Sequence, residues 1–140
     1  MTEQVKFHFD IDGENFTSAG EASVRIKKLL REMGFSPDVI RRVSVAMYEG
    51  EINMVIHANG GDADVLVTPD KIEIILADSG PGIADIELAM KEGFSTAPDN
   101  IRSLGFGAGM GLPNMKRYTD DMRIESEVGK GTTIYMTVNV

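Results

Sequence analysis

Two alternating apolar runs joined by a turn constrain the fold more than any other part of the sequence. They lie in "ADVLVTPDKIEIILA" at residues 63–77, on either side of Pro69–Asp70. Alternation with a period of two predicts strands with one buried face, and a Pro–Asp break between two such runs is typical of a hairpin. The sequence therefore predicts strands at 63–68 and 71–77, in a sheet whose apolar face needs a second layer.

The rest of the chain supplies three more strands and several helices. Strands are predicted at 5–11, 121–127 and 132–139, with His8 on the exposed side of the first. A helix is predicted from a capping box at Ser18–Glu21 to Gly34. A second helix begins at Ser36, with Pro37 in its first position. Its apolar stripe comprises Ile40, Val43, Met47, Gly50 and Met54. Short helices are predicted at 85–90 and 113–119.

These elements predict an α+β fold, a two-layer α/β sandwich with a mixed, mostly antiparallel sheet and helices on one face. The length of 140 residues suits one domain over residues 1–140. The absence of cysteine excludes a disulfide framework and a thiolate metal site. A net charge of −8 disfavours nucleic acid and anionic membranes as general partners. Without a signal peptide or a long apolar run, we expect a cytoplasmic protein.

The second predicted helix carries the first candidate functional pair, Glu49 and Asn53. They lie one turn apart at the rim of its apolar stripe, about 40° from each other around the axis. The asparagine carbonyl oxygen is a hard ligand suited to Mg²⁺, and the glutamate can act as a base. A solvated Glu and a helix-compatible Asn are the alternative interpretation. Between them, Gly50 costs about 1 kcal/mol relative to Ala, which close packing against a neighbouring element would explain.

The second candidate motif is "ADSGPGI", directly after the strand at 71–77. The Asp78 carboxylate can accept a hydrogen bond from an exocyclic amine such as that of adenine. Gly80 and Gly82 leave room for a flat ring to approach the backbone. The alternative is a tight turn, because Asp, Ser, Gly and Pro all favour turns.

The third motif is "LGFGAGMGLP" at residues 104–113, where every second residue from 105 to 111 is glycine. Backbone N–H groups at a glycine-rich helix N-terminus bind anions such as phosphates. A Rossmann fingerprint is excluded, because Met110 stands where its third glycine would be and no strand precedes the motif. A flexible loop without a ligand is the alternative.

The three motifs together resemble the GHKL ATPase superfamily, which includes gyrase, Hsp90, histidine kinases and MutL. The resemblance rests on their order: Asn on an early helix, Asp-x-Gly-x-Gly after a strand, and Gly-x-Gly-x-Gly before a later helix. The chain is most similar to the small stand-alone anti-sigma-factor serine kinases and their switch-protein relatives. Glu49–Asn53, His57–Ala58 and the ending "GMGLPNMKRYTDDMRIESEVGKGTTIYMTV" carry that likeness, whereas Met54 replaces a commonly small residue.

The resemblance implies a Bergerat fold that binds ATP or ADP together with Mg²⁺. Asn53 would coordinate the Mg²⁺, Glu49 would be the general base, and Asp78 would bind the adenine amine. The remaining implied nucleotide contacts are Gly80, Gly82, Gly105, Gly107, Gly109, Met110, Gly111, Leu112 and Thr132, with Thr133 as a neighbouring candidate. Residues 93–108 would form a lid over the nucleotide.

The activity implied by the resemblance is transfer of the ATP γ-phosphoryl group to a serine or threonine of a protein partner. That partner would be a sigma factor or a STAS-type antagonist. Three alternatives stay open: a nucleotide-dependent binding switch without transfer, an ATPase subunit of a larger complex, and a domain that no longer binds nucleotide. Because members often dimerise, a homodimer is also left open.

Overall fold

A computed structural model describes residues 4–12, 20–58, 60–83, 90 and 111–140. Along the chain its elements are β1 (Val5–Asp12), α1 (Glu21–Glu32), α2 (Pro37–His57), β2 (Gly60–Val67), β3 (Lys71–Asp78), α5 (Gly111–Tyr118), β4 (Asp121–Glu127) and β5 (Gly131–Asn139). The five predicted strands and the two long predicted helices are confirmed. Most of the helix predicted at 85–90 lies outside the described residues. No helix in the described part of the chain is both long enough and apolar enough to cross a membrane.

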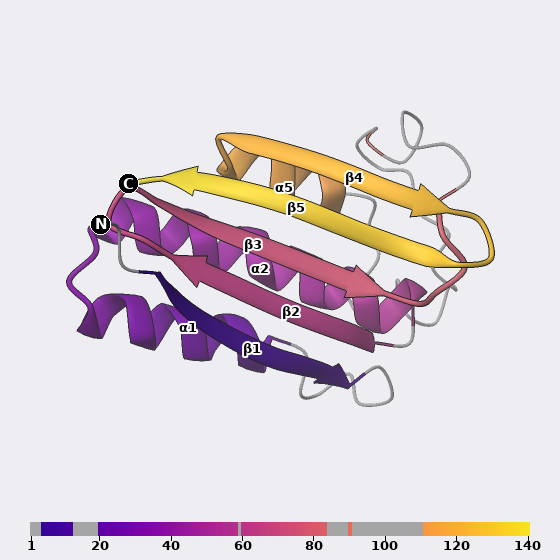
Figure 1. The fold of residues 1–140 in the computed structure, drawn as a ribbon, viewed down its shortest axis with the longest axis horizontal. Helices are drawn as coiled ribbons and strands as arrows, with labels where there is room; N and C mark the ends of the chain where they lie inside the picture. Colours follow the sequence, from indigo (N-terminus) through magenta and orange to yellow (C-terminus); the bar gives the residue numbers. More distant parts are fainter. Residues whose placement is uncertain (1–3, 13–19, 59, 84–89, 91–110) are drawn as a thin grey trace.

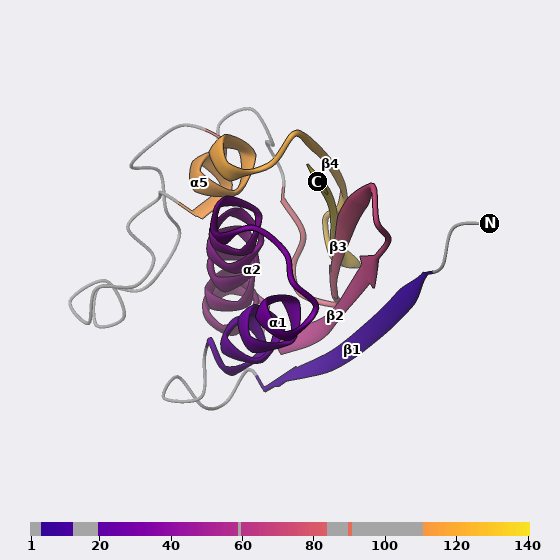
Figure 2. The same ribbon diagram turned by 90° about the vertical axis from the view of Figure 1, so that its left-hand side faces the viewer.

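The strands form one sheet in the order β1-β2-β3-β5-β4 (Figure 1). Each of these neighbouring pairs is antiparallel, which confirms the predominantly antiparallel pairing that was predicted. The described strands contain no parallel pair, so among them the sheet is antiparallel throughout and not mixed. Figure 2 shows α1, α2 and α5 side by side against one face of the sheet. The result is the predicted two-layer sandwich, with the other face of the sheet open among the described residues.

The core lies between the two layers and follows the predicted alternation. Val65, Ile74 and Met136 point from the sheet towards the helices and are almost fully buried. A Cβ at Gly50 would overlap the Leu76 side chain of β3 and lie 3.6 Å from Met115 Sδ of α5. Gly50 therefore lets α2 lie close to β3, which confirms the packing explanation for a glycine inside a helix.

The start of α2 and the end of α1 follow the predicted local sequence signals. Ser36 caps α2 by accepting a hydrogen bond from the Val39 N–H at 3.3 Å, with Pro37 in the first position as predicted. Gly34 ends α1 with φ of 85°, and the Phe35 N–H returns to the Leu30 carbonyl oxygen at 3.2 Å. Both predictions are confirmed.

The start of α1 differs from the prediction. Its N-cap is Gly20, with φ of 99° and no side-chain cap of its own, so the capping box headed by Ser18 is wrong. The cap comes instead from Glu51 of α2, whose side chain is only 1% exposed. Its carboxylate accepts hydrogen bonds from the N–H groups of Gly20 at 2.9 Å, Ala22 at 3.3 Å and Ser23 at 2.6 Å. A side chain from a neighbouring helix thus satisfies donors that a local residue satisfies in most helices.

Candidate functional site

The first two sequence motifs meet where α2 and β3 end, at the same end of the molecule (Figure 1). A Cβ at Gly80 would lie 2.6 Å from Cβ of Ala58, the residue that caps the C-terminus of α2. The turn after β3 is therefore in contact with the helix that carries Glu49 and Asn53. The fold thus brings α2 and the turn that follows Asp78 together, although the hairpin of β2 and β3 separates them in sequence.

Asp78 is fixed at this end by the backbone of two elements. Its Oδ1 accepts hydrogen bonds from the Gly80 N–H at 2.9 Å and from the Thr132 N–H of β5 at 3.2 Å. Its Oδ2 accepts no hydrogen bond within the described residues. One carboxylate oxygen is therefore bound to the backbone of the fold, and the contact of Asp78 with an amine donor stays a prediction.

Thr132 and Ser126 extend this polar network across the sheet. Thr132 is buried, and its Oγ1 lies 2.8 Å from Ser126 Oγ. Ser126 Oγ also accepts a hydrogen bond from the Ile83 N–H at 2.7 Å, which holds the segment that follows the Asp78 turn. The sequence interpretation missed Ser126, although it shares a face of β4 with Met122 and Ile124, where alternation leads one to expect an apolar residue.

The two glycines after Asp78 are both packed against their own chain. Gly82 has φ of 79°, and a Cβ there would overlap the carbonyl group of Glu127. The adjacent Pro81 carbonyl oxygen accepts a hydrogen bond from the Gly129 N–H at 2.8 Å. These contacts explain why positions 80 and 82 are glycine, and their contact with a nucleotide base stays a prediction.

Glu49 lies between α2 and α5 and is partly exposed. Its Oε1 accepts a hydrogen bond from Asn114 Nδ2 of α5 at 3.2 Å. Asn114 Oδ1 in turn accepts one from Arg117 Nη1 at 3.3 Å, so the amide is oriented from both sides. Asn53, one turn further along α2, is also partly exposed. Asn114 is a site residue that the sequence interpretation did not identify.

The third motif is only partly described. Gly105, Gly107, Gly109, Met110 and the predicted lid at 93–108 lie outside the described residues. Gly111 is the first residue of α5, so the helix predicted at 113–119 is present but begins two residues earlier than predicted. Leu112 is 8% exposed and belongs to the apolar core, so packing accounts for its side chain and its predicted nucleotide contact stays a prediction.

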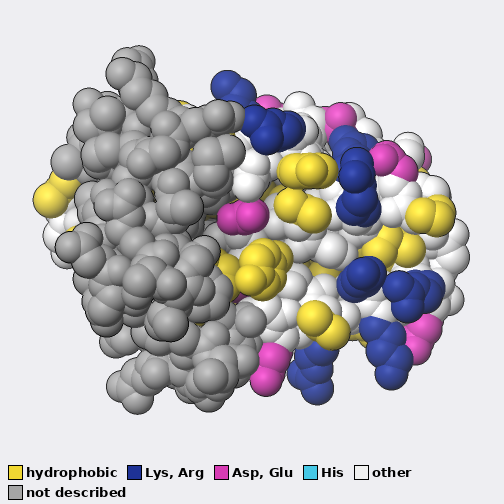
Figure 3. All heavy atoms as spheres, turned by 180° about the vertical axis from the view of Figure 1, so that it is seen from behind, with side chains coloured by type: hydrophobic (Ala, Val, Ile, Leu, Met, Phe, Trp, Pro, Cys, Tyr) yellow, Lys and Arg dark blue, Asp and Glu magenta, His cyan; other side chains and the backbone are white. Residues whose placement is uncertain are grey.

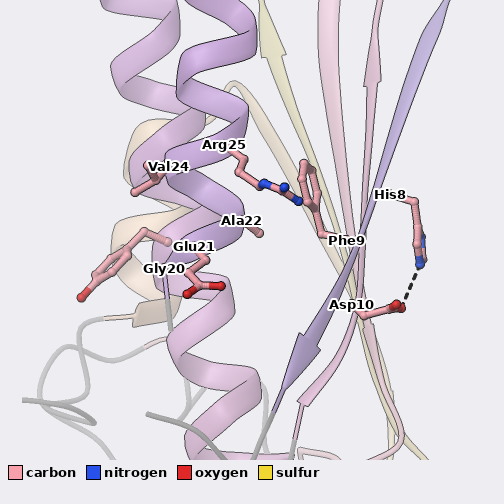
Figure 4. A pocket seen from close by; sticks show the side chains of 9 residues that line it. His8, Phe9, Asp10, Gly20, Glu21, Ala22, Val24 and Arg25 are labelled. Carbon is pink, nitrogen blue, oxygen red and sulfur yellow. Dashed lines mark hydrogen bonds and ion pairs between the residues drawn. The ribbon is translucent and has the colours of Figure 1, made fainter. Parts of the chain in front are cut away.

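A separate hollow of about 810 Å³ lies at the N-terminal end of α1 and contains none of the predicted site residues. Figure 4 shows Arg25 extending towards the ring of Phe9, with His8 on the far side of β1. His8 Nδ1 is 2.7 Å from Asp64 Oδ1, and its Nε2 is 3.1 Å from Asp10 Oδ1. The hydrogen bonds to Asp64 and Asp10 raise the pKa of His8. The predicted exposed histidine thus lies between two carboxylates on the open face of the sheet and forms ion pairs with them when its ring is protonated.

Comparisons with known proteins agree with this architecture. The histidine kinase-like ATPase domain family matches residues 15–138. The chain is 28% identical to an anti-sigma F factor of Geobacillus stearothermophilus, over 97% of this chain and 92% of that protein. It is 33% identical to the serine/threonine-protein kinase RsbT of Bacillus subtilis, over 77% of this chain and 78% of that protein.

A solved structure supports the fold independently of sequence identity. The crystal structure of the RsbU and RsbW domains of a Mycobacterium tuberculosis protein matches 96% of this chain with a TM-score of 0.66. The match spans 32% of that longer chain at 16% sequence identity, which is evidence for a shared fold. The fold of this chain is therefore that of a known domain type.

Proposed function

Because the chain belongs to the histidine kinase-like ATPase domain family, we propose that it binds ATP and phosphorylates a serine or threonine of a small protein partner. The family match and the relatives named anti-sigma F factor and serine/threonine-protein kinase RsbT support this activity. One structural observation carries the site assignment. Glu49 on α2 is hydrogen-bonded to Asn114 on α5, the helix that begins at Gly111. That bond joins the helix of the first motif to the helix that follows the third.

In this proposal the adenine binds at the end of β3. Asp78 accepts the adenine amine with Oδ2, because Oδ1 already accepts the Gly80 and Thr132 N–H groups. The phosphates lie towards the start of α5, where unpaired backbone N–H groups and the helix dipole favour negative charge. The glycines of the third motif, including Gly111, leave space for the triphosphate.

Mg²⁺ suits the donor set on α2. Asn53 offers a neutral carbonyl oxygen one turn from the Glu49 carboxylate, and oxygen ligands of this kind are those that Mg²⁺ prefers. When bound, the ion would neutralise negative charge on the phosphate oxygens. We assign Asn53 as its protein ligand.

Glu49 is the group that moves a proton. It accepts the proton of the partner's hydroxyl group while the hydroxyl oxygen bonds to the γ-phosphorus. The bond between the γ-phosphorus and the β,γ-bridging oxygen breaks, and ADP leaves. Asn114 positions the carboxylate through Glu49 Oε1. We place this reaction, which consumes ATP and a protein substrate, in the cytoplasm.

The test of this activity is incubation of the purified chain with γ-labelled ATP and candidate partners, a sigma factor and a STAS-type protein. Label on a partner serine or threonine supports the kinase. Free labelled phosphate alone indicates an ATPase, and saturable nucleotide binding with neither product indicates a binding switch. Glu49→Ala should keep ATP affinity and lose turnover, whereas Glu125→Ala on the open face of the sheet should change neither. Full turnover in Glu49→Ala would rule out its role as base.

The nucleotide site is tested by calorimetric titration of ATP and ADP with and without Mg²⁺. Asp78→Asn replaces an acceptor oxygen by an amide and should weaken binding about tenfold or more, since a hydrogen bond to a charged group contributes roughly 1.5–3 kcal/mol. Asp121→Asn, at the exposed start of β4, is the matched control. Unchanged affinity in Asp78→Asn would contradict the assignment of the base pocket.

A further inference from the structure

The helical layer carries positive charge although the chain as a whole is acidic. Eight of the 14 Lys and Arg residues, but only five of the 22 Asp and Glu residues, lie in α1, α2 and α5. Seen from the helical side, Lys and Arg side chains gather around exposed hydrophobic groups (Figure 3). We name this surface the basic helical face. We define it by five of the exposed cations of this layer: Lys27, Lys28 and Arg31 of α1, Arg41 of α2 and Lys116 of α5.

The charges of the basic helical face are not neutralised by the described part of the chain. None of its five named cations forms an ion pair with a described carboxylate, whereas cations elsewhere do. On the open face of the sheet, Lys71 Nζ is 2.8 Å from Glu73 Oε1. Arg123 Nη1 is 3.3 Å from Glu125 Oε1. The unpaired cations therefore create a local positive potential that is complementary to an acidic surface.

The basic helical face also presents an arginine stacked on a tyrosine ring and exposed hydrophobic side chains. Arg41 Cζ lies 5.5 Å from the centre of the Tyr118 ring, which holds a planar guanidinium in a fixed place. Val24 and Tyr48 expose 68% and 41% of their surface on α1 and α2. Arginine and tyrosine beside exposed aliphatic groups are typical of protein–protein contacts.

We propose that the basic helical face binds an acidic protein surface that also presents apolar side chains, the docking surface of the protein partner. The proposal rests on the proposed function for the expectation of a protein partner. An extended polyanion such as a bilayer or a nucleic acid is repelled by the net charge of −8. A protein contact of limited size senses mainly the local potential, because screening limits its range to about 10 Å.

The position of this face leaves the nucleotide end accessible. Arg31 and Lys116 lie in the last turns of α1 and α5, and Arg41 lies near the start of α2. Asn53 and the start of α5 lie at the opposite ends of their helices. The basic helical face therefore contributes to the affinity for the partner and leaves nucleotide affinity unchanged.

The test uses a fluorescein-labelled short peptide that contains glutamate and leucine, because it presents acidic and apolar groups over a contact of limited size. Anionic vesicles and duplex DNA are the comparison probes. The variant is Lys28→Glu/Arg31→Glu. The control is Lys6→Glu/Lys130→Glu, which changes the net charge equally at exposed positions outside the helices. Wild type should bind this acidic peptide with an affinity that falls as salt rises. The helical double variant should lose on the order of tenfold in affinity, and the control less than about twofold.

Three results would overturn the proposal: no binding by wild type, equal losses in both double variants, or tighter binding of wild type to vesicles or DNA. If the glutamate variant fails to fold, Lys28→Gln/Arg31→Gln removes the charges more conservatively and should lose affinity in the same direction. Nucleotide affinity is measured on every variant. If no variant or wild type binds nucleotide, but the acidic peptide binds wild type and the helical double variant loses that affinity, the proposed function is refuted and the docking surface is supported.

Discussion

Removing the Glu51 carboxylate should destabilise the protein more than any change to an exposed carboxylate of the helices. The side chain is 1% exposed and accepts hydrogen bonds from three backbone N–H groups at the start of α1. The first turn of a helix has no internal acceptors for these donors. Glu51→Ala therefore leaves three buried donors unsatisfied and also opens a cavity between α1 and α2.

The magnitude follows from those contacts. An unsatisfied buried donor costs about 1–3 kcal/mol, and losing an N-cap costs about 0.5–2 kcal/mol. Because fraying of the first turn and entry of water recover part of this, we expect Glu51→Ala to lose about 3–5 kcal/mol of unfolding free energy. That is a large part of the roughly 5–15 kcal/mol typical of a domain. Glu51→Gln keeps one acceptor oxygen and should lose about 1–2 kcal/mol.

The effect should depend on pH with a definite sign. Burial raises the pKa of the Glu51 carboxyl group, opposed by the N–H donors of Ser23, Gly20 and Ala22. A folded-state pKa above the unfolded value means that ionisation costs more in the folded chain. The stability of wild type relative to Glu51→Gln is therefore greatest below the unfolded pKa, near 4.5, and declines as pH rises through the folded-state pKa.

The assay is urea unfolding followed by circular dichroism at a series of pH values. Glu21→Ala is the matched control, since Glu21 lies in the first turn of α1 but is exposed. We expect it to change the unfolding free energy by less than about 1 kcal/mol. A Glu51→Ala protein within about 1 kcal/mol of wild type would refute the argument that this carboxylate caps α1.

Three further predictions rest on single contacts. Asn114→Ala removes the hydrogen-bond donor to Glu49, so it should lower turnover about tenfold and change ATP affinity less than about twofold. The control Asn139→Ala should change neither quantity. An unchanged rate in Asn114→Ala would exclude a positioning role for this residue. Gly50→Ala should lower the unfolding free energy measured in urea by about 1–2 kcal/mol, because overlap of the new Cβ with Leu76 outweighs the better helix propensity of alanine. An increase in stability would contradict this packing. Asp64→Asn should lower the pKa of His8, followed by NMR, because the Asp64 hydrogen bond is the largest cause of its increase. The stability from that bond is present below the ordinary pKa of 6.5 and is lost as pH rises through the folded-state pKa, so an unshifted His8 titration in the variant would contradict it.

The parts of the fold that could be predicted are those set by local chemistry. The alternation in residues 63–77 defines the hairpin because one face of each strand must be buried. Ser36 followed by Pro37 defines the start of α2, and Gly34 the end of α1, because both act on backbone within a few residues. These signals involve no partner from a distant part of the chain.

The residues that escaped prediction act on partners far away in sequence. Glu51 lies one turn from Met47 of the predicted apolar stripe, so the sequence indicates that it lies on a buried side of the helix. Its hydrogen-bond donors, however, lie 28 to 31 residues earlier on another helix. Asn114 is separated from Glu49 by 65 residues. Local periodicity reports which side of an element is buried, but only the packed fold determines which group it meets there.

Three consecutive residues of α2 each contact a different neighbouring element of the fold. This arrangement explains how Glu49, the candidate base, is positioned. Glu49 meets α5 through Asn114, Gly50 lies against Leu76 of β3, and Glu51 caps α1. Because successive helical residues are about 100° apart, Glu49 and Glu51 point to opposite flanks of α2. The two carboxylates can therefore be perturbed separately. Loss of the Glu51 cap should lower stability and leave the turnover of folded protein intact, whereas loss of Asn114 should lower turnover and leave stability nearly intact.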